Sequence, residues 1–409
     1  MVFDTLSAES LVPVAASSEV ADILVDLFVV LLAAKLGDEL FRRLHQPTLI
    51  GEILAGVIVG PSVIGIVEPG EVLEAFAEIG VVLLLFWAGL ESRLSEMRQV
   101  GKAALSVGLL GLAIPFAGGL GVALALGESS ETALFIAAAL MATSAGITTA
   151  VMKELGVLGT RASRTILGAA IVDDILALIL LSVAVGVAAE GGINVVDTLV
   201  VSGIAVAFVL FIGLGGTQTL QRAPHLMEAP RFAESPLLPA VLLCLGLAAL
   251  SAQIGLAAIV GAFLAGMIVA ETKEQNDVES EIAPLYAFFP PFFFVFIGAN
   301  VDLGELANAE ALGILAFVTV VAVATKYVGA WLGALQMGRA EARFVGAGMV
   351  PRGEVGIVVA GIGVTEGVVG PQLFAVIVGM AVLTTVIAPP VLRRLARSLP
   401  PDPEPAAPD

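Results

Sequence analysis

Cysteine, histidine and basic residues are scarce in this chain of 409 residues. Cys244 is the only cysteine and there are two histidines. An intramolecular disulfide is therefore excluded, and no Cys/His cluster suggests zinc or haem. Lys and Arg total 19 against 37 Asp and Glu, which gives a formal net charge of −18. Because nucleic acid is itself anionic, we expect no nucleic-acid partner, and we expect no cofactor.

Charged residues of either sign make up only 14% of the chain, whereas hydrophobic residues make up 58%. Soluble domains are about a quarter charged and about half apolar. Apolar stretches recur from end to end, and a stretch of about 20 residues can cross a hydrocarbon core of about 30 Å. The sequence therefore predicts an all-α polytopic membrane protein within the lipid bilayer.

Polar and Gly/Pro breaks divide the apolar sequence into about 13 transmembrane helices. The predicted helices are 21–41, 47–66, 72–90, 102–126, 132–152, 165–189, 195–220, 236–252, 255–271, 283–300, 310–336, 343–364 and 371–395. With the N-terminus outside, 16 of the 19 basic residues fall in or beside cytoplasmic loops and the tail, and the other three are Lys35, Lys326 and Arg352. Cytoplasmic loops are rich in Lys and Arg. We therefore expect a multi-pass protein of the cytoplasmic membrane, with its N-terminus outside and its C-terminus inside.

Five ionisable side chains lie well inside these helices: Asp173, Asp174, Lys326, Arg352 and Glu354. At a rise of 1.5 Å per residue, all five lie about 12–15 Å from the cytoplasmic helix ends, near the middle of the membrane. A charge at that depth costs about 2.5–3.5 kcal/mol on insertion scales, so such residues are candidates for function. The alternative is that they only tie helices together, which does not require two adjacent like charges.

The helical pattern is interrupted at the same depth in two places. The segment "MATSAGITTA" contains Thr143, Ser144 and Gly146, and "GMVPRGEVG" contains Pro351 and Gly353. Glycine and proline are tolerated at this depth where the loosened backbone lines a cavity, although close helix packing also explains glycines. Two broken, crossing helices are typical of the ion site of secondary transporters, and their positions as helices five and twelve fit an inverted repeat.

The five charges leave this layer with a net charge of −1 if all are ionised, since three are acids and two are bases. Such a layer attracts one small cation, and either a metal ion or a proton neutralises it. Burial and an adjacent carboxylate both favour the protonated form of an aspartate. A cation and a proton would therefore compete for one carboxylate, which is the basis of antiport.

Four segments carry a more specific signal: "MATSAGITTAVMKELGVLGTRASRTILGAAIVDDILALILL", "PPFFFVFIGANVDL", "VATKYVGAWLGAL" and "GAGMVPRGEVGIVVAGI". Together they resemble the bacterial NapA-type sodium/proton antiporters. These belong to the branch of monovalent cation:proton antiporters that includes the Kef-type potassium efflux proteins. The resemblance runs from about residue 21 to 395.

The resemblance implies roles for the aspartate pair. Asp174 would bind the transported sodium ion and the proton, and Asp173 would form a salt bridge with Lys326. Neighbouring residues point about 100° apart on a helix, so the two carboxylates can face different surroundings. The form with two aspartates and a membrane lysine is the electrogenic one in this family, moving more than one proton per metal ion.

The resemblance also covers four further site residues. Thr143 and Ser144 match a hydroxyl segment near the ion, and Glu354 and Arg352 match a charged pair with a supporting role.

At the level of domains, the resemblance implies a homodimer in which a core moves against a scaffold in an elevator-type alternating-access cycle. The predicted parts are an external N-terminal segment (1–20), a dimerisation or scaffold domain (21–100 and 221–305), a core ion-transport domain (101–190 and 306–396), a linker helix (191–220) and an acidic cytoplasmic tail (397–409).

The sequence thus predicts exchange of sodium or lithium for protons. Potassium/proton exchange stays open, although Kef-type relatives replace the first aspartate, which this chain keeps as Asp173. A cation channel or an ion sensor using the same pocket is less favoured. An enzyme is least favoured, because no nucleophile–base or metal-ligand group is visible.

Overall fold

The computed structural model of the protein describes residues 17–44, 46–92, 101–189, 195–216, 237–272 and 275–399. Over these residues the secondary structure is helical, with no strand. Most of the predicted N-terminal segment, up to residue 16, lies outside the described residues, and so does the predicted tail beyond residue 399.

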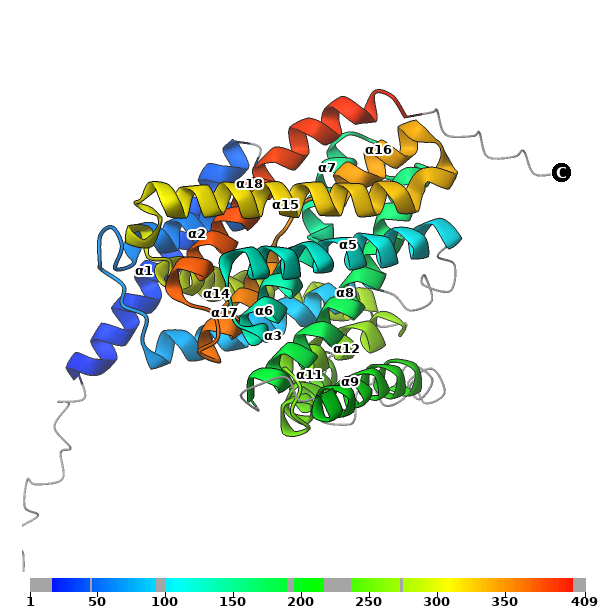
Figure 1. Ribbon diagram of the computed structural model, residues 1–409. Coiled ribbons are helices and arrows are strands. Elements are labelled where there is room, and N and C mark those ends of the chain that lie inside the picture. The colour runs from blue at the N-terminus through cyan, green and yellow to red at the C-terminus, as the bar shows by residue number, and fades with distance from the viewer. Residues whose placement is uncertain are drawn as a thin grey trace, which may run out of the picture.

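The elements are short and long helices joined by brief turns (Figure 1). In chain order they are α1 (Ser17–Arg43), α2 (Thr48–Val59), α3 (Glu71–Leu90), α5 (Lys102–Leu126), α6 (Ser130–Met141), α7 (Ala145–Glu154), α8 (Arg161–Ala189), α9 (Val195–Leu210), the π-helical η1 (Phe211–Gly216), α11 (Leu237–Gln253), α12 (Ala258–Ala270), α13 (Gln275–Phe288), α14 (Pro290–Ala299), the 3-10 turn η3 (Leu303–Leu306), α15 (Ala309–Ala334), the 3-10 turn η4 (Leu335–Met337), α16 (Arg339–Gly348), α17 (Glu354–Thr365) and α18 (Pro371–Ala396).

Seven helical segments of the described chain are long and apolar enough to cross a membrane: Glu71–Leu90, Lys102–Leu126, Ser130–Glu154, Arg161–Ala188, Val278–Ala299, Ala309–Met337 and Pro371–Ala396. Four apolar helices, α2, α11, α12 and α17, are shorter. The fold is therefore that of a multi-pass helical membrane protein. The number of crossings, thirteen by sequence, stays a prediction.

The predicted helix 47–66 is shorter in the structure, because α2 ends at Val59. Gly60 takes an extended conformation, which is typical of a residue before proline, and Pro61 cannot donate a backbone hydrogen bond. The chain then turns through Gly65, whose φ of 67° suits glycine. The apolar residues after Pro61 therefore form a tight loop rather than another helical turn.

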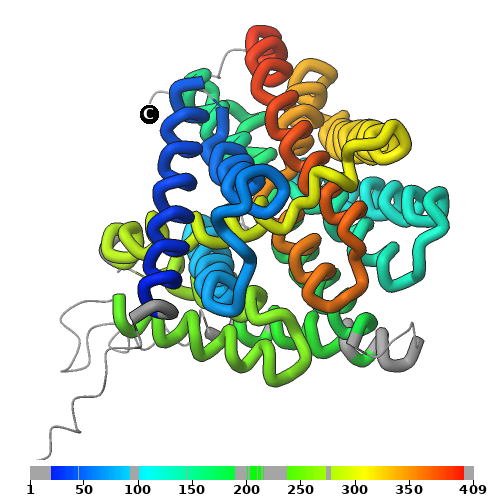
Figure 2. The backbone as a smooth tube through the Cα atoms, turned by 90° about the vertical axis from the view of Figure 1, so that its left-hand side faces the viewer, coloured from blue at the N-terminus to red at the C-terminus, as the bar shows by residue number. Residues whose placement is uncertain are grey.

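The helices pack as two groups, seen side by side in Figure 2. In the first group, α1 and α14 pack against α2, and α12 packs against α3, with α11 and α13 beside them. In the second group, α5 lies along α15 and also contacts α6 and α8, while α16, α17 and α18 pack around them (Figure 1). The first group comes from the ranges predicted as scaffold and the second from those predicted as core. Whether the first group dimerises and the second moves stays a prediction.

Helices α2 and α14 approach so closely that glycine is required between them. A Cβ atom added to Gly56 would overlap the carbonyl oxygen of Val295, and one added to Gly298 would overlap that of Ile53. Small residues allow such backbone contact in membranes, where van der Waals packing drives helix association. The two glycines therefore fix the geometry of the first helix group.

We expect Gly56→Ala to lower the free energy of unfolding by about 1–3 kcal/mol, because the new methyl group must separate α2 from α14. Gly121→Ala is the matched control, since an added Cβ there meets no atom within 4 Å. Thermal unfolding of both variants in detergent measures the effect. Equal melting temperatures for the two variants would contradict this packing.

Candidate functional site

Two interrupted helices meet in the second helix group. Residues 142–144 separate α6 from α7, and residues 349–353 separate α16 from α17. The backbone N–H of Ser144 donates to the carbonyl oxygen of Pro351 at 3.0 Å. Since this bond joins one break directly to the other, the two breaks form a single irregular region inside the helical bundle.

The residues of the second break suit this close contact. Pro351 cannot continue a helix, because its nitrogen carries no hydrogen. A Cβ atom on Gly353 would lie 2.6 Å from the Cβ atom of Ser144, a distance that real side chains do not adopt. Glycine is therefore needed where the two breaks cross.

Hydroxyl groups satisfy the carbonyls that the second break leaves free. Thr143 Oγ1 donates to the carbonyl oxygen of Met349 at 3.4 Å, and Thr148 Oγ1 donates to that of Gly348 at 2.6 Å. Both threonines are buried. Non-helical backbone at this depth needs such internal partners, because no lipid group can replace them.

A threonine pair of α18 holds the second break from its other side. Thr384 Oγ1 accepts from the backbone N–H of Arg352 at 3.2 Å, and Thr385 Oγ1 donates to the carbonyl oxygen of Arg352 at 2.5 Å. These two threonines were not predicted as site residues from the sequence. Their only signal is a pair of hydroxyl residues within the apolar run "AVLTTVIA".

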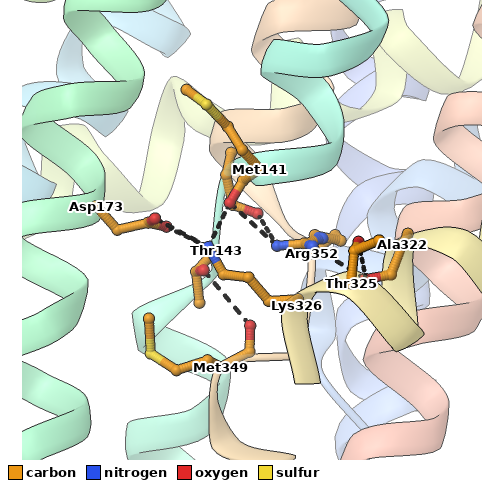
Figure 3. A network of polar contacts seen from close by, with 9 residues as sticks. Met141, Thr143, Asp173, Ala322, Thr325, Lys326, Met349 and Arg352 are labelled. Atoms are coloured by element: carbon orange, nitrogen blue, oxygen red, sulfur yellow. Dashed lines mark hydrogen bonds and ion pairs between the residues drawn. The ribbon is translucent and has the colours of Figure 1, made fainter. Parts of the chain in front are cut away.

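Asp173 and Lys326 form an ion pair that is completely buried. The Lys326 Nζ atom lies 2.9 Å and 3.0 Å from the two carboxylate oxygens of Asp173, and both residues are 0% exposed. The same ammonium donates to the carbonyl oxygen of Met141, the last residue of α6, at 2.5 Å. Figure 3 shows Lys326 reaching from α15 between these partners.

The guanidinium of Arg352 lies on the same end of α6. Its Nη1 donates to the carbonyl oxygens of Met141 at 3.2 Å and Ala142 at 2.7 Å, and its Nη2 donates to that of Ala322 at 3.3 Å (Figure 3). The C-terminal end of a helix carries partial negative charge and unpaired carbonyls. Arg352 therefore caps the broken helix α6, and within the described chain it forms no ion pair with Glu354. The supporting role of these two residues stays a prediction.

Asp174 has different surroundings from Asp173, although the two are adjacent on α8. Asp173 is completely buried, whereas Asp174 is partly exposed and lines a cavity of about 1050 Å³. Ser144 and Glu354 line the same cavity, and Ser144 Oγ donates to Glu354 Oε2 at 2.8 Å. The structure thus brings the first break, the second break and Asp174 to one face of the cavity.

The opposite wall of the cavity belongs to the first helix group. It includes Glu52 of α2, Trp87 and Glu91 at the end of α3, and Tyr286 of α13. The rings of Trp87 and Tyr286 stack with centroids 4.6 Å apart, and Trp87 Nε1 donates to Glu91 Oε1 at 3.1 Å. These four residues were not predicted as site residues from the sequence. The available signal was Glu52, the one charge in the apolar helix "TLIGEILAGVIV".

Charged side chains surround the mouth of the cavity. Lys35 and Arg42 come from α1, whereas Glu154 and Arg393 come from the second group and form an ion pair at 3.0 Å. Arg42 and Arg393 lie in the last turns of α1 and α18, at helix ends that the charge distribution predicts to be cytoplasmic. On that prediction the cavity opens to the cytoplasm.

Among the described residues, no group of three or more His, Cys, Asp or Glu side chains could hold a metal ion. Asp174 and Glu354 are instead single carboxylates facing a wide cavity.

Comparison with known families gives a match over nearly the whole chain. A family model described as the transmembrane sodium/hydrogen exchanger matches residues 27–398. This range includes every residue of the site and both helix groups except the first ten residues of α1.

Two curated relatives are similar over most of their length. The Na(+)/H(+)-K(+) antiporter GerN of Bacillus cereus is 37% identical over 368 residues, which are 89% of this chain and 94% of the relative. The high-affinity Na(+)/H(+) antiporter NhaS3 of Synechocystis is 35% identical and aligns with 91% of this chain and 89% of its own.

A solved structure supports the fold independently. The sodium proton antiporter MjNhaP1 of Methanocaldococcus jannaschii superposes with a TM-score of 0.71 and 19% sequence identity. The superposition covers 93% of this chain and 99% of the other.

Proposed function

The chain belongs to the sodium/hydrogen exchanger family, and on this premise we propose that it exchanges sodium or lithium ions for protons across the cytoplasmic membrane. The observation that supports this most directly is the division of the aspartate pair. Asp173 is buried against Lys326, whereas Asp174 faces the cavity. One carboxylate is therefore neutralised in place, and the other is available to an ion arriving through water.

The ion site of this proposal consists of Asp174, Ser144 and Glu354. Arg352 is held by backbone carbonyls and Asp173 by Lys326, so the cavity face presents two carboxylates without a basic partner. Such a face attracts a cation. A sodium ion or a proton can neutralise Asp174, but both cannot be held there together, and this competition couples the two fluxes.

Thr143 has a supporting place in the proposed site. Its hydroxyl bonds to the backbone of the other break and thereby fixes the position of Ser144. We infer that Thr143 shapes the ion site, whereas Ser144 can offer its hydroxyl oxygen to the ion itself.

The proposed transport cycle is an elevator-type alternating access. Asp174 and both breaks belong to the second helix group, whereas the opposite wall of the cavity belongs to the first. Movement of the second group past the first would carry the bound ion from one side of the membrane to the other. In this scheme the first group forms the contact between two protomers of a homodimer.

The ion pair of Asp173 and Lys326 is the proposed source of electrogenic exchange. We expect Lys326→Gln to reduce or abolish the net charge moved per cycle, because a neutral amide cannot release and rebind a proton. Exchange in proteoliposomes under an imposed membrane potential measures this change. Lys153→Gln, an exposed lysine, serves as the control, and an unchanged voltage dependence of Lys326→Gln would refute the assignment.

The proposed function is tested by reconstituting the protein in proteoliposomes with an imposed pH gradient and a pH-sensitive dye. Sodium and lithium are expected to dissipate the gradient. If neither cation does so, the proposal is wrong.

Potassium/proton exchange is the second candidate, because the relative GerN is named as a Na(+)/H(+)-K(+) antiporter. Potassium chloride in the same assay separates the two candidates. A cation channel would instead give large unitary conductance in planar bilayers without proton movement, and an ion sensor would give neither signal.

A further inference from the structure

Glu52 is a buried carboxylate with no visible partner. It is only 8% exposed, and in the described part of the chain no hydrogen bond or ion pair involves its side chain. The neighbouring Lys35 is paired with Asp38, with 4.0 Å between Nζ and Oδ2. Yet Glu52 lines the cavity, on the wall opposite Asp174.

Three other acidic residues of this region each have a side-chain partner, which Glu52 lacks within the described chain. Asp173 is held by Lys326, Glu354 accepts from Ser144, and Glu91 accepts from Trp87. A carboxylate that loses most of its water without gaining a protein partner destabilises the fold. Glu52 faces the cavity, which Lys35 and Asp38 also line, so any further partner reaches it from the cavity.

The cavity is suited to a hard monovalent cation. Glu52, Glu91 and Glu354 line this cavity together with Asp174, so these carboxylates share one region. Six acidic and three basic side chains line the cavity, so its lining carries an excess of negative charge, which concentrates cations. Hard cations bind oxygen ligands and keep some of their water where protein ligands are few.

We propose that Glu52 is a second cation-binding carboxylate, which takes a partly hydrated sodium or other monovalent cation from the cavity mouth and passes it to Asp174. This inference rests on the proposed cation exchange. Glu52 belongs to the first helix group and Asp174 to the second. Glu52 therefore serves loading and release on the side to which the cavity opens, and it does not travel with the ion.

The transport test compares Glu52→Gln with wild type in proteoliposomes. Removing the charge is expected to raise the KM for sodium about tenfold, because the local cation concentration falls, and to change kcat less than about twofold. Glu52→Asp, which keeps the carboxylate, is expected to recover most of the affinity. Glu78→Gln on α3 is the control, since Glu78 is exposed and does not line the cavity; it leaves both constants unchanged.

A binding test separates this inference from the proposed function. In the Asp174→Asn protein, sodium chloride is expected to raise the thermal unfolding temperature more than choline chloride does, and Glu52→Gln is expected to remove the difference. If wild type exchanges cations but Glu52→Gln changes neither KM nor this sodium effect, the inference is wrong and the proposed function stands. If wild type does not exchange cations but the sodium effect depends on Glu52, the proposed exchange is wrong and cation binding at Glu52 stands.

A purely structural role for Glu52 predicts a different pattern. Glu52→Gln and Glu52→Ser would then lower the melting temperature in both salts and leave the KM of the folded fraction unchanged. That result would also overturn the proposal.

Discussion

Asp174→Asn is expected to reduce cation/proton exchange to the level of vesicles without protein. Asparagine has nearly the same size as aspartate, so the fold and the cavity should persist. It cannot take up a proton at this position or balance the charge of a cation. Asp174 is the aspartate that faces the cavity. Asp173 cannot take over its role, because the Asp173 carboxylate is paired with Lys326.

The measurement is dye-monitored exchange with sodium, lithium and potassium, together with size-exclusion chromatography to show that the variant is folded. Asp22→Asn provides the matched control, because Asp22 is exposed on α1 and does not line the cavity. Normal exchange by a folded Asp174→Asn protein would remove Asp174 from the site.

Lys326→Met is expected to give the largest loss of stability, about 3–5 kcal/mol, because it leaves the Asp173 carboxylate buried without a counter-charge. Thermal unfolding in detergent measures this loss.

The double variant Asp173→Asn/Lys326→Met tests the cause. With both charges gone, no uncompensated carboxylate remains, and stability is expected to return close to that of wild type. If the double variant is as unstable as Lys326→Met alone, lost packing of the lysine chain explains the effect instead. A stable double variant also provides a sound background for measuring electrogenicity.

The polar layer could be found from sequence because its members are easy to recognise and easy to place. Asp173, Asp174 and Lys326 are isolated charges in apolar runs, and the constant rise of a helix converts their positions into depths. Pro351 and Gly353 mark the second break by their own backbone chemistry. Equal depth alone does not bring residues together; the structure places these residues in one region because α6, α8, α15 and α17 pack within the second helix group.

The partners of Arg352 could not be predicted, because they are backbone atoms. A sequence shows which side chains carry charge, but every residue has the same carbonyl. Only the crossing of the two breaks decides that Met141 and Ala142 turn their carbonyls toward the guanidinium. The same reason explains why the clamp of Thr384 and Thr385 was missed.

Glu52 was missed for a different reason. It lies on the second turn of α2, close enough to a helix end for a charge to reach water by extending its side chain. Its burial depends on how α2 packs against its neighbours, which no local pattern shows. The predicted helix continued to residue 66, whereas α2 ends at Val59, because the residues after Pro61 are apolar and extend the hydrophobic run.

The carbonyl oxygen of Met141 accepts from two cations at once, Lys326 at 2.5 Å and Arg352 at 3.2 Å. This backbone oxygen thereby connects Lys326, which neutralises Asp173, to the non-helical segment that leads to Ser144. A change in the charge of Lys326 would alter its hydrogen bond to this oxygen. Met141 lies only three residues before Ser144, which lines the cavity. In the proposed exchange, a proton at the ion pair and a cation at Asp174 would therefore be coupled through the main chain as well as through the electric field between the two carboxylates.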